Sequence, residues 1–248
     1  MARRGARVGE DIPVTSESRP YRAVLFDADG VLQWPRPGWL HKFNVLGGPG
    51  FIKEAFAREK GTLTGELDIV PVIADLLAEL GRDVAPSEVL DVWCDIMVDQ
   101  EALDLVARLR ASGVTTVLAT NQQSYRGDYM QRAFDFDRYF DKQFFSYEVG
   151  LAKPDTAFFQ HIADEVGLPL SEMFFVDDLQ ENVDGAAEAG LDAARHFIFG
   201  ESDIVALLNG DDPELMARAD EIFAQLSEGN AARLEALLRA HGIEVPSA

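Results

Sequence analysis

The sequence predicts an α/β protein, a doubly wound, Rossmann-like parallel sheet that carries an inserted α-helical cap. Two observations lead to this prediction. Short apolar runs alternate with segments of helical periodicity, as they do in parallel sheets with crossover helices. Roughly 65 residues, 33–99, interrupt this alternation, which is too long for an ordinary loop. With 248 residues, 47% of them hydrophobic, the chain can bury a large domain and a smaller inserted one.

Four apolar, β-compatible runs are predicted to form the buried strands. They are YRAVLF at 21–26, VTTVLAT at 114–120, MFFVDD at 173–178 and AARHFIF at 193–199. Their largely continuous apolar character favours parallel strands that are covered on both faces. Residues 1–20 contain basic residues but lack the apolar stretch of a signal peptide, so we expect a loose N-terminal tail.

Three helices are predicted to connect or follow these strands, at 101–113, 155–167 and 180–190. Each segment has helical spacing and ends on a glycine, which suits the left-handed C-terminal cap of a helix. The strands and helices together assign the Rossmann-like core to residues 21–32 and 100–200.

The interval 33–99 is predicted to be the helical cap. Segments 49–61 and 68–81 have helical periodicity, and 85–100 opens with Ala-Pro-Ser-Glu, which is typical of a helix start. Residues 201–248 contain further amphipathic segments, at 201–210, 213–229 and 231–242. We expect these C-terminal helices to pack on the core or on a partner, so the chain is a monomer or a homodimer.

The charge balance restricts the partners. The formal net charge of −21 would repel nucleic acid and anionic membrane surfaces, and no apolar stretch approaches the length of a membrane span. A small anionic substrate remains compatible where a cation reverses the local field. The single cysteine, Cys94, leaves no intrachain disulfide, and the four histidines are scattered, so we expect a cytoplasmic protein without a zinc site.

Polar residues follow the predicted strands at the edge where open α/β sheets bind ligands. Asp27-Ala28-Asp29-Gly30 follows the first strand, and Asp177-Asp178 closes the third. Carboxylates gathered at one edge repel one another unless a cation compensates, and their oxygens suit Mg²⁺.

Two further strand-end segments could bind phosphate oxygens. Thr120-Asn121 ends the second strand, and Lys153 precedes a proline and a helix. Taken singly, Thr120-Asn121 is more typical of an ordinary turn or helix cap, and Lys153 of a surface residue.

Taken together, D-x-D-G, T-N, K-P and D-D-x-x-x-N resemble the four motifs of the haloacid dehalogenase superfamily over about residues 21–199. The position of the 33–99 insertion is similar to that of subfamily I, whose α-helical cap lies between the first two motifs. The resemblance implies that Asp27 is the nucleophile and that Asp29 carries the proton. It implies that Thr120, the backbone amide of Asn121 and Lys153 bind the phosphoryl group. Mg²⁺ would be held by Asp27, the Asp29 carbonyl and Asp178, with Asp177 as an additional or water-mediated contact.

The resemblance implies a Mg²⁺-dependent phosphatase that acts on a small phosphorylated metabolite. Asp29 favours this reaction over dehalogenation, because displacement of halide needs no proton donor. A phosphotransferase or mutase remains an alternative, as do a phosphonatase that would use a cap lysine and a catalytically silent binding protein. We expect Trp34 and Arg36, near the hinge of the cap, to contact the substrate, although packing of the tryptophan is an equal alternative.

Overall fold

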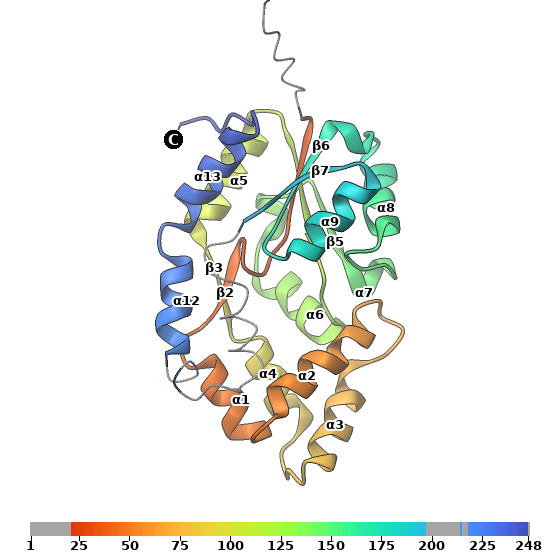
Figure 1. Ribbon diagram of the computed structural model, residues 1–248, viewed down its shortest axis with the longest axis vertical. Coiled ribbons are helices and arrows are strands. Elements are labelled where there is room, and N and C mark those ends of the chain that lie inside the picture. The colour runs from red at the N-terminus through yellow and green to blue at the C-terminus, as the bar shows by residue number, and fades with distance from the viewer. Residues whose placement is uncertain (1–20, 197–213, 215–217, 248) are drawn as a thin grey trace, which may run out of the picture.

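The computed structural model describes residues 21–196, 214 and 218–247. Its core is a five-stranded parallel sheet in the order β5-β4-β1-β6-β7, which confirms the predicted doubly wound α/β fold (Figure 1). The strands are β1 Ala23–Phe26, β4 Thr115–Thr120, β5 Lys142–Phe145, β6 Met173–Asp177 and β7 Asp192–Arg195. The central strand β1 pairs in parallel with β4 on one side and with β6 on the other. The first, second and fourth motifs, which follow these strands, therefore lie together at the carboxyl ends of the strands.

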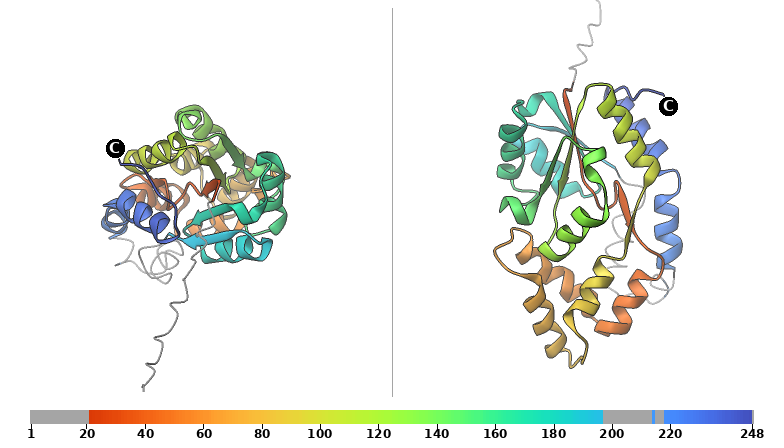
Figure 2. Two further views of the ribbon diagram at one scale, coloured as in Figure 1. Left: turned by 90° about the horizontal axis from the view of Figure 1, so that it is seen from above. Right: turned by 180° about the vertical axis from the view of Figure 1, so that it is seen from behind.

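Helices cover both faces of the sheet (Figure 2). Alternate residues of β1 point to opposite faces of the sheet and join two separate apolar clusters. The cluster on one face includes residues of α5 and α13, and the cluster on the other face includes residues of α8 and α9. The core helices are α5 Gln100–Ala111, α6 Ser124–Ala133, α7 Ser146–Val149, α8 Thr156–Val166 and α9 Gln180–Ala189, with 3-10 turns at Phe136–Arg138 and Leu170–Glu172.

Strand β5 was not among the predicted strands. Its sequence, KQFF, is short, and its first two residues are half-buried because it lies at the edge of the sheet. An edge strand with polar residues lacks the continuous apolar run by which the other strands were recognised. The last residues of the predicted strand 193–199 lie outside the described residues, as do 1–20 and the predicted helix 201–210.

The insertion is a helical body joined to the core by a two-stranded antiparallel ribbon, β2 Gln33–Pro35 with β3 Ile96–Val98. Its helices are α1 Trp39–Gly47, α2 Phe51–Glu59, α3 Ile69–Glu79 and α4 Pro86–Trp93, with a 3-10 turn at Lys60–Thr62. They enclose a separate apolar cluster that includes Phe43, Phe51 and Trp93. The helix predicted over 85–100 was too long: it ends at Trp93, because Ile96–Val98 find a strand partner more than 60 positions earlier, a long-range pairing that local periodicity does not show.

The described C-terminal helices, α12 Ala219–Ser227 and α13 Asn230–Ala240, run along both parts of the molecule (Figure 1). Leu234 and Leu238 of α13 are fully buried in the cluster that contains α5. Asp220 of α12 accepts a hydrogen bond of 2.7 Å from the backbone of Gly38, and the Phe223 ring lies edge-on to Trp39 of the cap. Within the described residues, no helix combines the length and apolar character that crossing a bilayer requires.

Candidate active site

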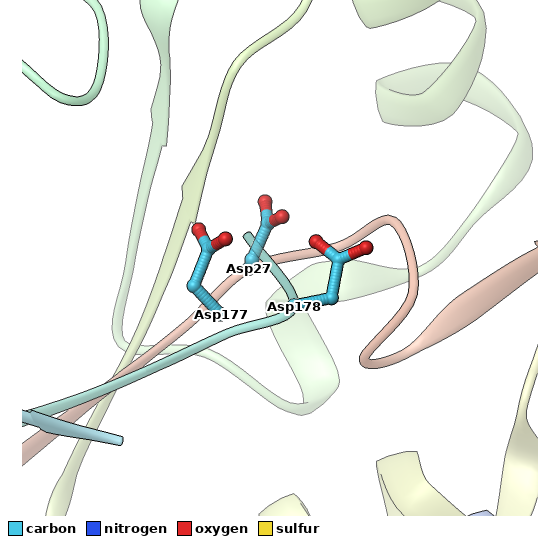
Figure 3. Close-up of side chains that lie close together, drawn as sticks. All are labelled: Asp27, Asp177 and Asp178. Carbon is cyan, nitrogen blue, oxygen red and sulfur yellow. The ribbon is translucent and has the colours of Figure 1, made fainter. Parts of the chain in front are cut away.

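Three carboxylates meet at the carboxyl ends of β1 and β6. Phe26 is in register with Val176, so Asp27 and Asp177 follow the paired positions of neighbouring strands, and Asp178 comes next. One oxygen of each of the three lies within 4.8 Å of the others (Figure 3). The parallel pairing of two strands thus brings together acids that are about 150 positions apart in the chain.

Lys153 is the cation of this cluster. Its Nζ lies 2.8 Å from Asp27 Oδ1 and 2.6 Å from Asp177 Oδ2, and its side chain is 0% exposed. The Asn121 side chain holds the backbone of Lys153 on both sides, since its amide nitrogen donates to the Lys153 carbonyl and its oxygen accepts from the Lys153 N–H. The T-N and K-P motifs are therefore fixed to each other through the Asn121 side chain, a contact that sequence analysis did not predict.

Asp177 and Asp178 have different surroundings. Both oxygens of Asp177 are occupied by hydrogen bonds from Lys153, Asn182 and the Leu179 backbone. Asp178 instead faces the loop after β1, where Gly30 has φ +74° and a Cβ would lie 2.5 Å from Asp178 Oδ2. Glycine is required there because any side chain would strain the backbone and displace the carboxylate.

The carboxylate cluster has more acidic groups than its one lysine can neutralise. Burial raises the pKa of Asp27 to about 7, although Lys153 opposes the shift, and burial together with Asp177 raises the pKa of Asp178 well above its ordinary value. Burial lowers the pKa of Lys153, but Asp177 and Asp27 outweigh it and bring that pKa to about 12. One ammonium group faces three carboxylates, so the donor set fits a hard divalent cation with oxygen ligands.

The Asp29 carboxylate is not a member of this carboxylate cluster. It forms a two-pronged ion pair with Arg126, and Gln33 and Gln122 also donate to it. Burial would raise the pKa of Asp29, but Arg126 and these hydrogen bonds outweigh it and hold the pKa below its ordinary value. The resemblance assigned proton transfer to Asp29 without indicating that its carboxylate has four donors.

Thr120 and Trp34 are buried, whereas Arg36 is half-exposed. Thr120 is fully buried at the end of β4, where its Oγ1 accepts a 2.9 Å hydrogen bond from Gln122. Trp34 is 5% exposed within the ribbon. Arg36 is half-exposed and lies 3.6 Å from Asp95. The recorded contacts of Trp34 and Arg36 are thus with the hinge, and their contact with substrate stays a prediction.

The cap lysines considered for phosphonate chemistry all have exposed side chains. Lys42 pairs with Asp95, and Lys53 and Lys60 lie on the surface of α2 and the turn after it. None of the three has a recorded contact with the described carboxylate cluster.

Arg126, Gln122 and Gln33 are site residues that sequence analysis missed. A usable signal was present: positions 122 and 126 are polar, one helical turn apart, and directly follow the end of β4. Their place in the site depends on their contact with Asp29, which is 97 positions from Arg126 in the chain. The local sequence pattern alone therefore did not predict that they belong to the site.

Comparison with known proteins now places the chain in a family. A model of haloacid dehalogenase-like hydrolases matches residues 21–190. This match covers more than half of the chain, which therefore belongs to the haloacid dehalogenase-like hydrolase family and is a hydrolase, as its four motifs predicted.

Two curated relatives are much longer than this chain. Mouse acyl-CoA dehydrogenase family member 10 is 30% identical over 196 residues, which are 71% of this chain and 18% of the mouse protein. Porcine bifunctional epoxide hydrolase 2 is 25% identical over 195 residues, 68% of this chain and 35% of that protein. The chain thus spans about a third or less of either relative.

Solved structures share the fold. A haloacid dehalogenase family enzyme from Bacteroides thetaiotaomicron, crystallised with magnesium, has a TM-score of 0.64 at 21% identity and covers 75% of this chain and 98% of its own. The same enzyme has been solved with magnesium and inorganic phosphate, with a TM-score of 0.60 at 24% identity over 70% of this chain and 93% of its own. L-2-haloacid dehalogenase from Xanthobacter autotrophicus has a TM-score of 0.58 at 18% identity, over 80% and 87%.

Proposed function

We propose that this hydrolase is a Mg²⁺-dependent phosphatase that cleaves a small phosphomonoester through an aspartyl-phosphate on Asp27. The observation that carries the proposal is the arrangement of Asp27 beside Lys153 within a cluster of three carboxylates. A similarly folded enzyme that binds magnesium and inorganic phosphate supports it.

The residues of the chain divide the reaction between them. Asp27 would attack phosphorus in line, which forms an aspartyl-phosphate and releases the alcohol. Lys153 orients Asp27 and, with Thr120 and the Asn121 amide, would bind the phosphoryl oxygens as their charge develops. Asp29 would give a proton to the leaving oxygen and take one from the water that hydrolyses the intermediate.

Asp27, Asp178 and the Asp29 carbonyl would hold the metal, with Asp177 turned mainly toward Lys153 and Asn182. When bound, Mg²⁺ offsets the repulsion between the attacking carboxylate and the phosphate oxygens. The carboxylate cluster and Asp29 favour phosphate over haloacid substrates, since a halide leaves without a proton.

Phosphate release is the direct test of this proposal. The purified protein is expected to hydrolyse p-nitrophenyl phosphate and at least one member of a panel of phosphorylated sugars and related metabolites with Mg²⁺, and to lose this activity in EDTA. Parallel assays with 2-haloacids are expected to release no halide. Inactivity on the whole phosphate panel, or halide release without phosphate release, would contradict the proposed reaction.

Stability of the metal-free protein is expected to depend on pH. Between the ordinary carboxyl pKa of 3.8 and about 7, folded Asp27 binds more protons than unfolded Asp27, so the free energy of unfolding falls as pH rises. The metal-free protein should therefore melt at a higher temperature at pH 5 than at pH 7.5, and Mg²⁺ should raise Tm more at pH 7.5. Scanning calorimetry with and without EDTA measures both, and an equal effect of Mg²⁺ at the two pH values would contradict the metal assignment.

A further inference from the structure

The Asp29 carboxylate is held by four side-chain donors. Arg126 Nη1 and Nη2 donate to its two oxygens at 2.6 Å each, Gln33 Nε2 donates at 3.0 Å and Gln122 Nε2 at 2.8 Å. A carboxylate has about four acceptor positions, and the paired geometry with a guanidinium is its most directional contact. These donors therefore set the orientation of the Asp29 carboxylate, whose side chain is 41% exposed.

Arg126 is itself fixed, and one of its anchors lies in the cap. Its side chain is 8% exposed. Besides Asp29, its Nη1 donates to Gln122 Oε1 at 2.6 Å, and its Nε donates at 3.0 Å to the carbonyl of Trp93, the last residue of α4. One guanidinium group thus spans the nucleophile loop, core helix α6 and the end of a cap helix.

A cap acid responds to the charges of Arg126 and Asp29. Glu59 lies half-buried at the end of α2. Burial raises the pKa of Glu59 to about 7, with Arg126 opposing and Asp29 adding to the shift. The protonation of an acid in the cap thus depends on the Arg126–Asp29 pair.

We propose that Arg126 is the positioning residue for Asp29 and couples its orientation to the position of the cap. While Arg126 bridges Asp29 and the Trp93 carbonyl, the carboxylate is fixed toward α6. Movement of α4 relative to α6 shifts the guanidinium and, with it, the orientation in which Asp29 gives its proton to the leaving oxygen. This role in catalysis rests on the proposed phosphatase function, whereas the physical coupling to the cap can be measured without substrate.

Leaving-group dependence distinguishes positioning of Asp29 from binding of substrate. R126Q is expected to lower kcat by about 100-fold for an alkyl ester such as glycerol 2-phosphate, which needs a protonated leaving group, and by less than about tenfold for p-nitrophenyl phosphate. KM should change little, because the side-chain partners of Arg126 are Asp29, Gln122 and the Trp93 carbonyl. R126K, which keeps the charge but not the paired geometry, should recover part of the loss.

A double-mutant cycle with D29N tests whether Arg126 acts through Asp29. In the D29N background, R126Q should change kcat by less than about twofold, since interacting residues are non-additive. R132Q, at an exposed arginine of the same helix, should match the wild type. An additive loss, or a raised KM with unchanged kcat, would show that Arg126 acts on the substrate independently and would overturn the positioning role.

Two measurements test the coupling even if no phosphate ester is cleaved. R126Q should lower Tm in the wild-type background but much less in D29N, and R126K should lower it less than R126Q. Hydrogen–deuterium exchange should accelerate over 93–98 and 28–34 in R126Q but not in R132Q, because the link between cap and loop is lost. Unchanged exchange of both segments in R126Q would overturn the coupling. If exchange changes in R126Q but the wild-type protein cleaves no phosphate ester, the result would contradict only the proposed phosphatase function.

Discussion

Asp27→Asn is expected to reduce kcat for phosphate release by about 1,000-fold or more, because an amide cannot supply the nucleophilic oxygen. The variant should remain folded: it keeps the shape of the side chain and removes one negative charge from a cluster of three. In metal-free buffer its Tm should equal or exceed that of the wild type. Phosphate release and calorimetry measured on the same preparation separate lost chemistry from lost structure.

The matched control for this substitution is Asp83→Asn, at an exposed position of the cap. It should keep the activity of the wild type. Mass spectrometry should first show that the Asp27→Asn sample is free of deamidated protein. If this variant then keeps more than a tenth of the wild-type kcat, Asp27 is not the nucleophile.

Lys153→Met is expected to abolish activity and also to destabilise the fold, which separates it from Asp27→Asn. The lysine is fully buried between Asp27 and Asp177, so its removal leaves two buried carboxylates without their counter-charge. Loss of one partner of a buried ion pair typically costs about 3–5 kcal/mol. Urea unfolding in EDTA measures this free energy, and Lys142→Met, at a half-exposed lysine paired with Glu165, is the control.

The destabilisation by Lys153→Met should grow with pH. Without the ammonium group the pKa of Asp27, already raised by burial, rises further, so the folded variant binds protons that the unfolded chain releases above its ordinary carboxyl pKa. The loss should therefore be smaller at pH 5 than at pH 8. An equal loss at both values would indicate a packing defect instead of unpaired charge.

The parts of the fold and site that the sequence predicted share one physical basis. Buried parallel strands such as β1, β4 and β6 are continuously apolar, so they are recognisable, and their ends share one edge of the sheet. Asp27, Asp177 and Asp178 could thus be placed together before their distances were known. Periodicity also located three of the four described cap helices.

The parts that were not predicted depend on contacts between distant side chains. The ribbon β2–β3 pairs segments more than 60 positions apart, and Arg126 reaches Asp29 across 97 positions. From the sequence, a buried arginine in the first turn of a helix cannot be distinguished from a solvent-exposed one until its partner is known. Asn121 is a similar case, since the motif indicates a backbone contact while the side chain fixes the Lys153 loop.

The close approach of Gly30 to Asp178 limits which parts of the molecule can accept substitutions. Because Gly30 has a positive φ and no side chain, a larger residue at position 30 would strain the backbone and displace the Asp178 carboxylate. The proposed function therefore assigns variation in substrate choice to the cap helices, which pack around a separate apolar cluster. The protein is in this sense modular, because substitutions inside the cap need not disturb the carboxylate cluster of the core.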